Sequence, residues 1–114
     1  MRIEFTLDCA DPRRLAEFWR AAFRFRTEGT IDDRYVALAG HGVRLTLQKV
    51  AEPKAVKNRM HIDVLVEDPG REVARLEGLG ATRLTEEPLR EFGQVWFVMA
   101  DPEGNEFCLA REPA

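Results

Sequence analysis

The sequence predicts a mixed α+β fold built from two copies of a βαβββ module. One observation is an internal repeat, in which residues 4–12 and residues 61–69 both read as an alternating strand followed by Asp-Pro. A second is that each Asp-Pro opens a segment with apolar residues at helical spacing. A third is that three short strand-like segments follow each helical segment, with a glycine-containing turn between the last two.

The first module is predicted over about residues 1–50. Its first strand leads into Asp11-Pro12, where Asp supplies an N-cap oxygen and Pro suits the first helical position because its missing N–H loses no hydrogen bond. The apolar face of the helix consists of Leu15, Phe18, Trp19, Ala22 and Phe23. Strands are expected at residues 25–30, 34–39 and 43–50.

The second module is predicted over about residues 59–112, after a polar, proline-containing linker at residues 51–58. Asp68-Pro69 opens its helix, which ends at Gly80. The strands that follow are expected at residues 82–86, 94–100 and 106–110. This module is seven residues longer, and we interpret the extra residues, around 86–93, as a solvated loop. Together the modules form a single predicted domain, residues 1–114.

Length and composition exclude several classes of protein. A chain of 114 residues is one domain, and 45% hydrophobic with 32% charged residues is the composition of a folded protein rather than a disordered one. No apolar run approaches the roughly 20 residues of a membrane span, and the N-terminus enters a strand without a signal peptide, so we expect a cytoplasmic protein with no membrane partner. The net charge of -3 argues against nucleic acid as a partner.

Strand alternation places polar side chains on one face of four predicted strands. The opposite face of the two leading strands is expected to pack on the helices, and it consists of Ile3, Phe5, Leu7, Cys9, Met60, Ile62, Val64 and Val66. The polar face consists of Glu4, Thr6, Asp8, Arg44, Thr46, Gln48, His61, Asp63, Glu106 and Cys108, with Trp96 as a candidate aromatic. Such a face either meets solvent, as in many antiparallel sheets, or lines a ligand cleft, and the residues alone leave both readings open.

The repeated strand, Asp-Pro and helix, together with the segment Asp101-Pro102-Glu103-Gly104-Asn105-Glu106-Phe107, resemble the vicinal oxygen chelate superfamily. This superfamily includes glyoxalase I, extradiol dioxygenases, and the fosfomycin and bleomycin resistance proteins. The resemblance runs from Arg2 to Arg111 and is strongest to the small glyoxalase-like branch. It implies two modules that form an incomplete β-barrel around a cleft with the helices outside, and it implies a homodimer.

In the metal-dependent members of this superfamily four positions supply ligands, and matched strand to strand they are Glu4, Arg44, His61 and Cys108 here. A bound divalent metal (Zn, Ni, Mn or Fe) would use Glu4 and His61, with Cys108 as a further candidate. Arg44 departs from the pattern because a guanidinium group stays protonated. An extradiol dioxygenase is disfavoured, since it needs two His and one carboxylate. Arg44 instead suggests an ion pair with Glu4 or a contact with an anionic ligand.

Two functions follow from this reading. The first is a protein of the bleomycin resistance type that binds a small molecule in the inter-module cleft without an intact metal site. The alternative is a metal-dependent lyase or isomerase, similar to glyoxalase I, that acts on a small oxygenated substrate with Glu4 and His61 as catalytic residues. His61 as a polar lining residue without chemistry is equally open. Whether the protein is an enzyme, and which ligand it takes, is not decided by the sequence.

Overall fold

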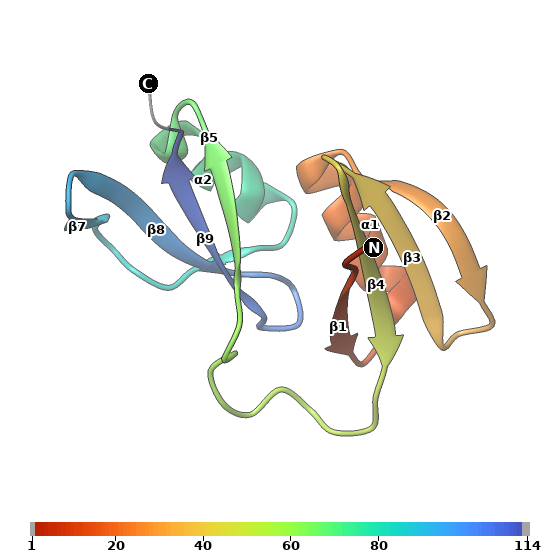
Figure 1. The fold of residues 1–114 in the computed structure, drawn as a ribbon. Helices are drawn as coiled ribbons and strands as arrows, with labels where there is room; N and C mark the ends of the chain where they lie inside the picture. The colour runs from red at the N-terminus through yellow and green to blue at the C-terminus, as the bar shows by residue number, and fades with distance from the viewer. Residues whose placement is uncertain (1, 113–114) are drawn as a thin grey trace. The chain divides into compact units, whose positions relative to one another are not determined.

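The chain folds into two compact units, Met1–Lys54 and Ala55–Ala114, which we call module one and module two and describe separately (Figure 1). The structure is a computed structural model that describes residues 2–112, so residues 1 and 113–114 of the predicted domain lie outside it. The boundary between the units falls inside the predicted linker 51–58. Among the described helices, none has the length and apolar character needed to cross a membrane.

Module one contains β1 (Phe5–Cys9), α1 (Pro12–Phe23), β2 (Arg26–Ile31), β3 (Tyr35–Gly40) and β4 (Val43–Lys49). Its sheet has the order β1-β4-β3-β2, in which β1 runs parallel to β4 and the other pairs are antiparallel. The three strands predicted after the helix are confirmed to within one residue at each end. Because β1 begins at Phe5, Ile3 and Glu4 precede the strand.

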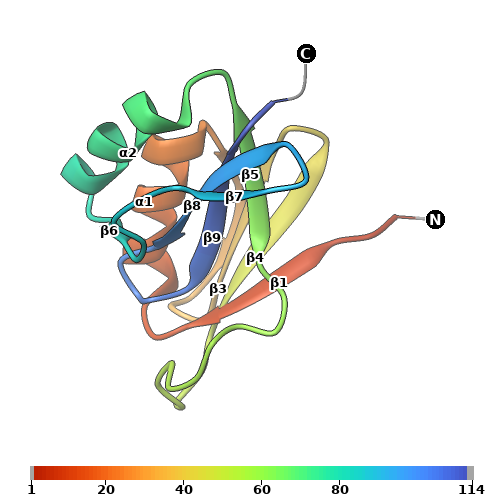
Figure 2. The ribbon, with the colours of Figure 1, turned by 90° about the vertical axis from the view of Figure 1, so that its left-hand side faces the viewer.

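Helix α1 begins and ends at the residues whose local chemistry predicts its bounds. The Asp11 side chain accepts a hydrogen bond from the Arg14 N–H at 3.2 Å, and Pro12 opens the first turn. At the other end Arg24 adopts a left-handed conformation, φ 58°, and its N–H donates to the Arg20 carbonyl. The predicted apolar face is buried, and α1 covers one face of its sheet (Figure 2).

Module two contains β5 (Ile62–Val66), α2 (Pro69–Gly78), β6 (Thr82–Arg83), β7 (Leu89–Glu91), β8 (Gln94–Ala100) and β9 (Glu106–Arg111). Its sheet has the order β5-β9-β8-β6, with β5 parallel to β9 and with β7 paired to β8. Asp68 caps α2 by accepting from the Arg71 N–H, and Gly80 follows the helix with φ 111°.

The predicted loop at 86–93 is wrong in part, because Leu89–Glu91 forms strand β7 of a hairpin with β8. The two turn residues, Phe92 and Gly93, have φ of 50° and 76°, as a two-residue type I′ turn requires. The strand predicted at 82–86 is correspondingly short, Thr82–Arg83. A three-residue polar strand carries almost no periodic signal of its own, and it is pairing with β8 that makes it a strand.

The Asp-Pro-Glu-Gly-Asn segment is a turn, as predicted, and Asp101 organises it. Asp101 is 2% exposed, and its Oδ1 accepts hydrogen bonds from the Glu103 N–H at 2.9 Å and the Asn105 N–H at 3.0 Å. Asn58 is joined to the same turn, since its Oδ1 accepts from the Glu106 N–H and its Nδ2 donates to Asn105 Oδ1. The last residue of the predicted linker is therefore held by module two.

The predicted division into an apolar and a polar face is confirmed on β4 and β9. Leu45, Leu47, Phe107 and Leu109 are buried, while the predicted polar-face residues are half-buried: Arg44, Thr46, Gln48, Glu106 and Cys108. The prediction is wrong for Ile3 and Met60, which are 73% and 63% exposed because both precede their strands. It is also wrong for Phe5, the first residue of β1, which is 37% exposed. The α+β class with two βαβββ modules is confirmed, and neither sheet closes into a barrel. We call the polar face the open face of each sheet.

Candidate functional sites

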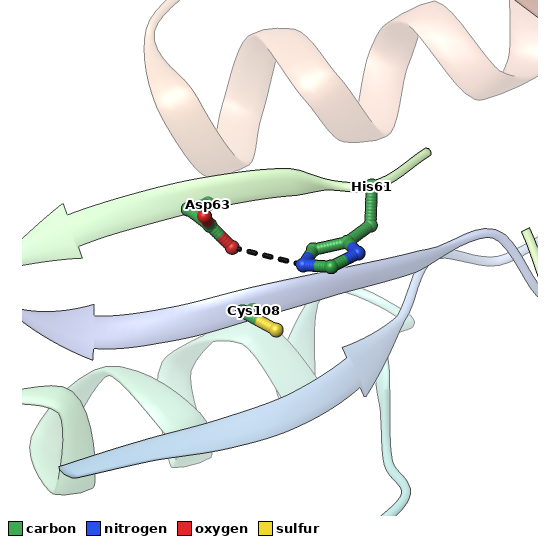
Figure 3. Close-up of side chains that lie close together, drawn as sticks. All are labelled: His61, Asp63 and Cys108. Atoms are coloured by element: carbon green, nitrogen blue, oxygen red, sulfur yellow. Dashed lines mark ion pairs between the residues drawn. The ribbon is translucent and has the colours of Figure 1, made fainter. Parts of the chain in front are cut away.

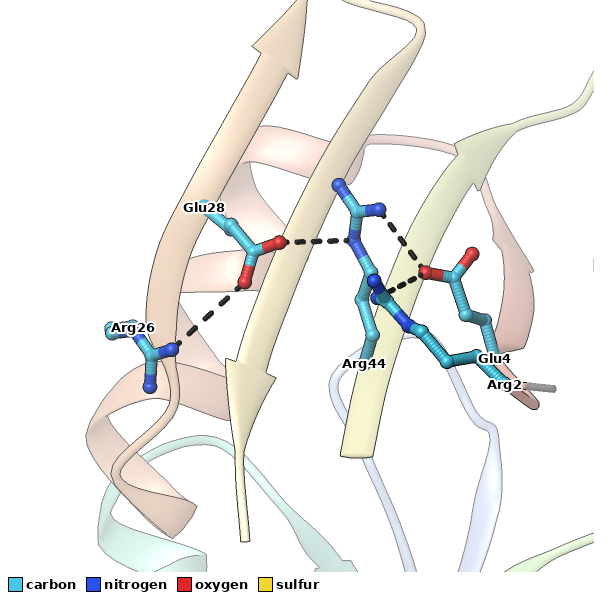
Figure 4. Close-up of polar contacts among 5 residues, drawn as sticks. All are labelled: Arg2, Glu4, Arg26, Glu28 and Arg44. Carbon is cyan, nitrogen blue, oxygen red and sulfur yellow. Dashed lines mark hydrogen bonds and ion pairs between the residues drawn. The ribbon is translucent and has the colours of Figure 1, made fainter. Parts of the chain in front are cut away.

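Arg44 is the centre of an ion-pair network on the open face of module one (Figure 4). It lies on β4 opposite Ala39 of β3, whose small side chain leaves room for the guanidinium group to reach β2. Nη1 of Arg44 donates to Glu4 Oε1 at 3.1 Å, and its Nε lies 3.6 Å from Glu28 Oε1. Of the two roles that the sequence leaves open for Arg44, the ion pair with Glu4 is present in the structure.

Two further arginines extend this network. Arg2 Nη2 lies 3.0 Å from Glu4 Oε1, and Arg26 Nη2 lies 4.0 Å from Glu28 Oε2. Both of these side chains are 75% exposed, whereas that of Arg44 is 33% exposed. Three guanidinium groups facing two carboxylates leave one formal positive charge. Within residues 2–112, the Nε of Arg44 is a buried donor without a hydrogen-bond acceptor.

A hollow of about 470 Å³ opens beside Arg44. Its charged lining consists of Arg2, Arg26, Glu28 and Arg44, and the β3–β4 turn at residues 40–42 supplies one wall. In this turn His41 is exposed but anchored, because its Nε2 lies 2.6 Å from the Phe23 carbonyl, so Nε2 carries the proton and donates. Its ring packs edge-on against Phe25 at 5.5 Å. The wall of the hollow is therefore tied to the end of α1.

A second cluster lies on module two, where His61, Asp63 and Cys108 come together (Figure 3). Asp63 of β5 is in register with Cys108 of β9, and His61 lies two residues before Asp63, on the same side of the chain. His61 Nε2 is 3.2 Å from Asp63 Oδ1, and the ligand atoms of all three residues lie within 4.8 Å of one another. The cluster follows from strand register.

The surroundings of the Cys108 thiol favour its protonated form. Partial burial raises its pKa, and the negative charge of Asp63 and a hydrogen bond from the thiol to Asp63 raise it further. Cys9, by contrast, is 4% exposed and lies in the core of module one, as its strand position predicts. Cys108 is therefore the accessible thiol of the two.

The other predicted site residues lie outside the two clusters. Thr6 and Asp8 on β1 are in register with Thr46 and Gln48 on β4, and Gln48 Nε2 donates to the Tyr35 hydroxyl at 3.4 Å. The remaining two belong to module two: Trp96 is half-buried on β8, and the Glu106 carboxylate accepts from the Asn58 N–H. The structure thus brings together Glu4 with Arg44, and His61 with Asp63 and Cys108.

Sequence reasoning did not place Arg2, Arg26 and Glu28 in a site. Arg26 and Glu28 are two residues apart on β2, a spacing that places both side chains on one face of a strand. That alternation is a signal that could have found them. Their link to Arg44 has no sequence signal, because it crosses the intervening strand β3.

The two βαβββ sheets define the fold as the vicinal oxygen chelate type. Residues 4–110 match the family model of the glyoxalase-like domain, and the chain belongs to this family. No curated protein matches it.

Solved structures with the same fold include a hypothetical protein from S. aureus, with a TM-score of 0.80 and 17% identity over 98% of this chain and 94% of the other. A glyoxalase/bleomycin resistance protein/dioxygenase family enzyme from Burkholderia phytofirmans has a TM-score of 0.79 and 16% identity over 95% of each chain. The fosfomycin resistance protein FosX from Mesorhizobium loti has a TM-score of 0.75 and 16% identity over 99% of this chain and 92% of its own. At these identities the likeness is one of fold.

The metal that the family resemblance implies does not fit its four positions in this chain. Arg44 occupies one of them, and its guanidinium group cannot act as a ligand and repels a cation. The Glu4 carboxylate at a second position is engaged by Arg44 and by Arg2. Module one therefore offers an ion pair where the metal-dependent members offer two ligands.

Proposed function

We propose that this protein binds a small organic molecule through an anionic group, a carboxylate or a phosphate, held in the hollow beside Arg44. The observation that carries the proposal is a partly buried guanidinium group on the wall of a hollow, held between two carboxylates in a network with one net positive charge. The function is the small-molecule binding predicted from the sequence, without the metal of the family.

Guanidinium groups suit this task because their fixed fork of N–H donors matches the paired oxygens of carboxylates and phosphates. Glu4 and Glu28 hold Arg44 from two sides, so its side chain loses little further freedom when a ligand binds. The exposed side chains of Arg2 and Arg26 are free to turn toward a bound anion while Arg44 stays in place. The single net positive charge of the network complements a monoanion.

The family adds support of a general kind. Structural neighbours are named as glyoxalase/bleomycin resistance and fosfomycin resistance proteins, which favours a small-molecule ligand. A homodimer and a cytoplasmic location, both expected from the sequence, are part of the same proposal.

The competing function, a metal-dependent lyase or isomerase, requires Glu4 as a metal ligand or proton carrier. The ion pair at 3.1 Å disfavours this role, because freeing the carboxylate leaves Arg44 with only the longer contact to Glu28. The two functions differ in their response to a chelator, since anion binding through Arg44 does not depend on a metal.

The test is isothermal titration of the whole protein, in the presence of a chelator, with inorganic phosphate and a set of small carboxylates and phosphate monoesters. A hydrogen bond to a charged group contributes about 1.5–3 kcal/mol, so Arg44→Met is expected to weaken binding by roughly 10- to 150-fold. Arg83→Met removes the same charge from an exposed position on β6 and serves as the matched control. The proposal is wrong if no anion binds, if Arg44→Met binds as well as Arg83→Met, or if binding requires an added divalent metal.

A further inference from the structure

We infer that His61, Asp63 and Cys108 form a binding site for a transition-metal cation of the Zn²⁺ type that is complete within module two. This inference is independent of the anion-binding function. His61 and Cys108 stand at two of the four family positions, but the inferred set differs from the family's because its carboxylate comes from Asp63 and no ligand comes from module one. Because Arg44 and Glu4 cannot serve as the metal ligands that the family resemblance implies, any metal bound here needs a ligand set within module two.

The strands already place the three side chains at the spacing that one metal ion requires. In a tetrahedral site with bonds of about 2.0–2.3 Å, neighbouring ligand atoms are about 3.2–3.8 Å apart. His61 Nε2 and Asp63 Oδ1 are 3.2 Å apart, which meets this requirement as they stand. A sulfur ligand and a nitrogen or oxygen ligand of such a site are about 3.5 Å apart. No ligand atom of the three lies more than 4.8 Å from another, so the Cys108 sulfur needs to approach by about 1.3 Å at most. A small side-chain rotation covers such a distance without moving the backbone.

The backbone supports the same geometry. Asp63 and Cys108 are register partners on parallel strands, and neighbouring strands lie about 4.8 Å apart. Hydrogen bonding between β5 and β9 therefore holds two of the ligands side by side. His61 immediately precedes β5, so its backbone has more freedom to adjust than that of Asp63.

The donor set selects the class of cation. Imidazole nitrogen, carboxylate oxygen and thiolate sulfur together suit Zn²⁺ and its neighbours in the first transition row, whereas Mg²⁺ and Ca²⁺ prefer oxygen ligands alone. Asp63 and a deprotonated Cys108 supply two negative charges that balance a divalent cation, and the thiol proton passes to solvent on binding. His61 and Asp63 are 39% and 60% exposed, so water has access to the fourth position.

Cobalt(II) is the probe for this site, because a bond from thiolate to cobalt gives a charge-transfer band in the near ultraviolet. The whole protein, reduced and stripped with chelator that is then removed, is titrated with Co²⁺ under anaerobic conditions. We expect one ion per chain, the charge-transfer band, stoichiometric displacement by Zn²⁺ and no displacement by excess Mg²⁺. Saturation without the band would place the metal elsewhere and overturn the inference.

Variants of the three ligands separate this site from alternatives. Cys108→Ser is expected to abolish the charge-transfer band. His61→Gln and Asp63→Asn are expected to weaken Co²⁺ binding at least about tenfold, because even the loss of a group that only hydrogen-bonds to a ligand lowers metal affinity by about 10- to 100-fold. Circular dichroism checks folding, and His61→Gln, which changes an exposed residue outside the strand, keeps the test valid if Cys108→Ser fails to fold.

Matched controls lie on module one. Cys9→Ala removes the buried thiol and Asp8→Asn an exposed carboxylate, and both are expected to leave Co²⁺ affinity unchanged. Glu4→Gln is the decisive variant, because it removes a ligand of the family set but not of the set inferred here. If Glu4→Gln weakens binding as much as Asp63→Asn does, the site is not confined to module two and the inference is wrong. Anion binding is measured in chelator, so either proposal can fail without the other.

Discussion

Replacing Arg44 by Met is expected to destabilise the protein by about 1 kcal/mol. Arg44 contacts Glu4 at 3.1 Å and Glu28 at 3.6 Å, and all three side chains are between one-third and two-fifths exposed. Ion pairs exposed to solvent contribute about 0.2–1 kcal/mol each, so two of them contribute roughly 0.4–2 kcal/mol. Met keeps the apolar stem of the side chain, so little packing is lost.

The loss stays small because neither carboxylate is left alone. Glu4 retains Arg2 at 3.0 Å, and Glu28 retains Arg26 at 4.0 Å. No buried, unpaired charge is created, which would cost about 3–5 kcal/mol. For a protein of this length, 1 kcal/mol lowers the melting temperature by roughly 4 °C.

Urea unfolding at low and high salt measures this effect. A double-mutant cycle of Arg44→Met with Glu4→Gln is expected to give a coupling free energy of about 0.3–1 kcal/mol. Near 1 M salt, where the Debye length is about 3 Å, most of this coupling is expected to disappear. Arg83→Met, at an exposed position, serves as the control and is expected to change stability by less than about 0.5 kcal/mol.

Two outcomes would refute this reasoning. A loss above about 3 kcal/mol would mean that Arg44 behaves as a buried charge. A coupling of zero at low salt would mean that the contact with Glu4 contributes nothing, and that Arg44 is not held in place for a ligand.

Two further predictions concern module two. Asp101→Ala leaves the buried N–H of Asn105 and the half-buried N–H of Glu103 without their acceptor. A buried donor without an acceptor costs about 1–3 kcal/mol and a half-buried one less, so urea unfolding should show a loss of about 2–4 kcal/mol. Asp101→Asn keeps one oxygen and should show a smaller loss. A loss below about 1 kcal/mol would contradict the role assigned to this turn. Because the pKa of the Cys108 thiol is raised, Cys108 in chelator should react with iodoacetamide more slowly at neutral pH than a free cysteine does, and the rate should increase as the pH rises toward this pKa. Asp63→Asn removes a negative neighbour and so lowers the pKa of Cys108. Cys108 in this variant should therefore react faster at the same pH. Labelling of Cys108 as fast as that of the urea-unfolded protein would show that its thiol is not protected.

Much of the fold follows from rules that act over a few residues. The N-caps Asp11 and Asp68, each followed by a proline, set the start of each helix. Strand alternation assigns Leu45 and Phe107 to the buried face. The alternation rule fails for a residue that lies outside a strand, such as Ile3, and for a strand that is defined only by its pairing, such as β7.

The candidate sites divide in the same way. The sequence by itself identified most of the chemistry: the polar face, the departure of Arg44 from the family pattern, and His61 and Cys108 as candidate ligands. It also suggested the ion pair of Glu4 with Arg44 as one of two roles for Arg44, although the two residues lie on segments far apart in the chain.

Only the tertiary structure decided which groups meet. The reach of Arg44 across β3 to Glu28 depends on the small side chain of Ala39, and the contact of Asp63 with Cys108 depends on the register between β5 and β9. Periodicity within a segment reports the face on which a side chain lies, because it reflects burial along one strand. It cannot report the neighbour across the sheet, because strand order and register are set by how the whole core packs.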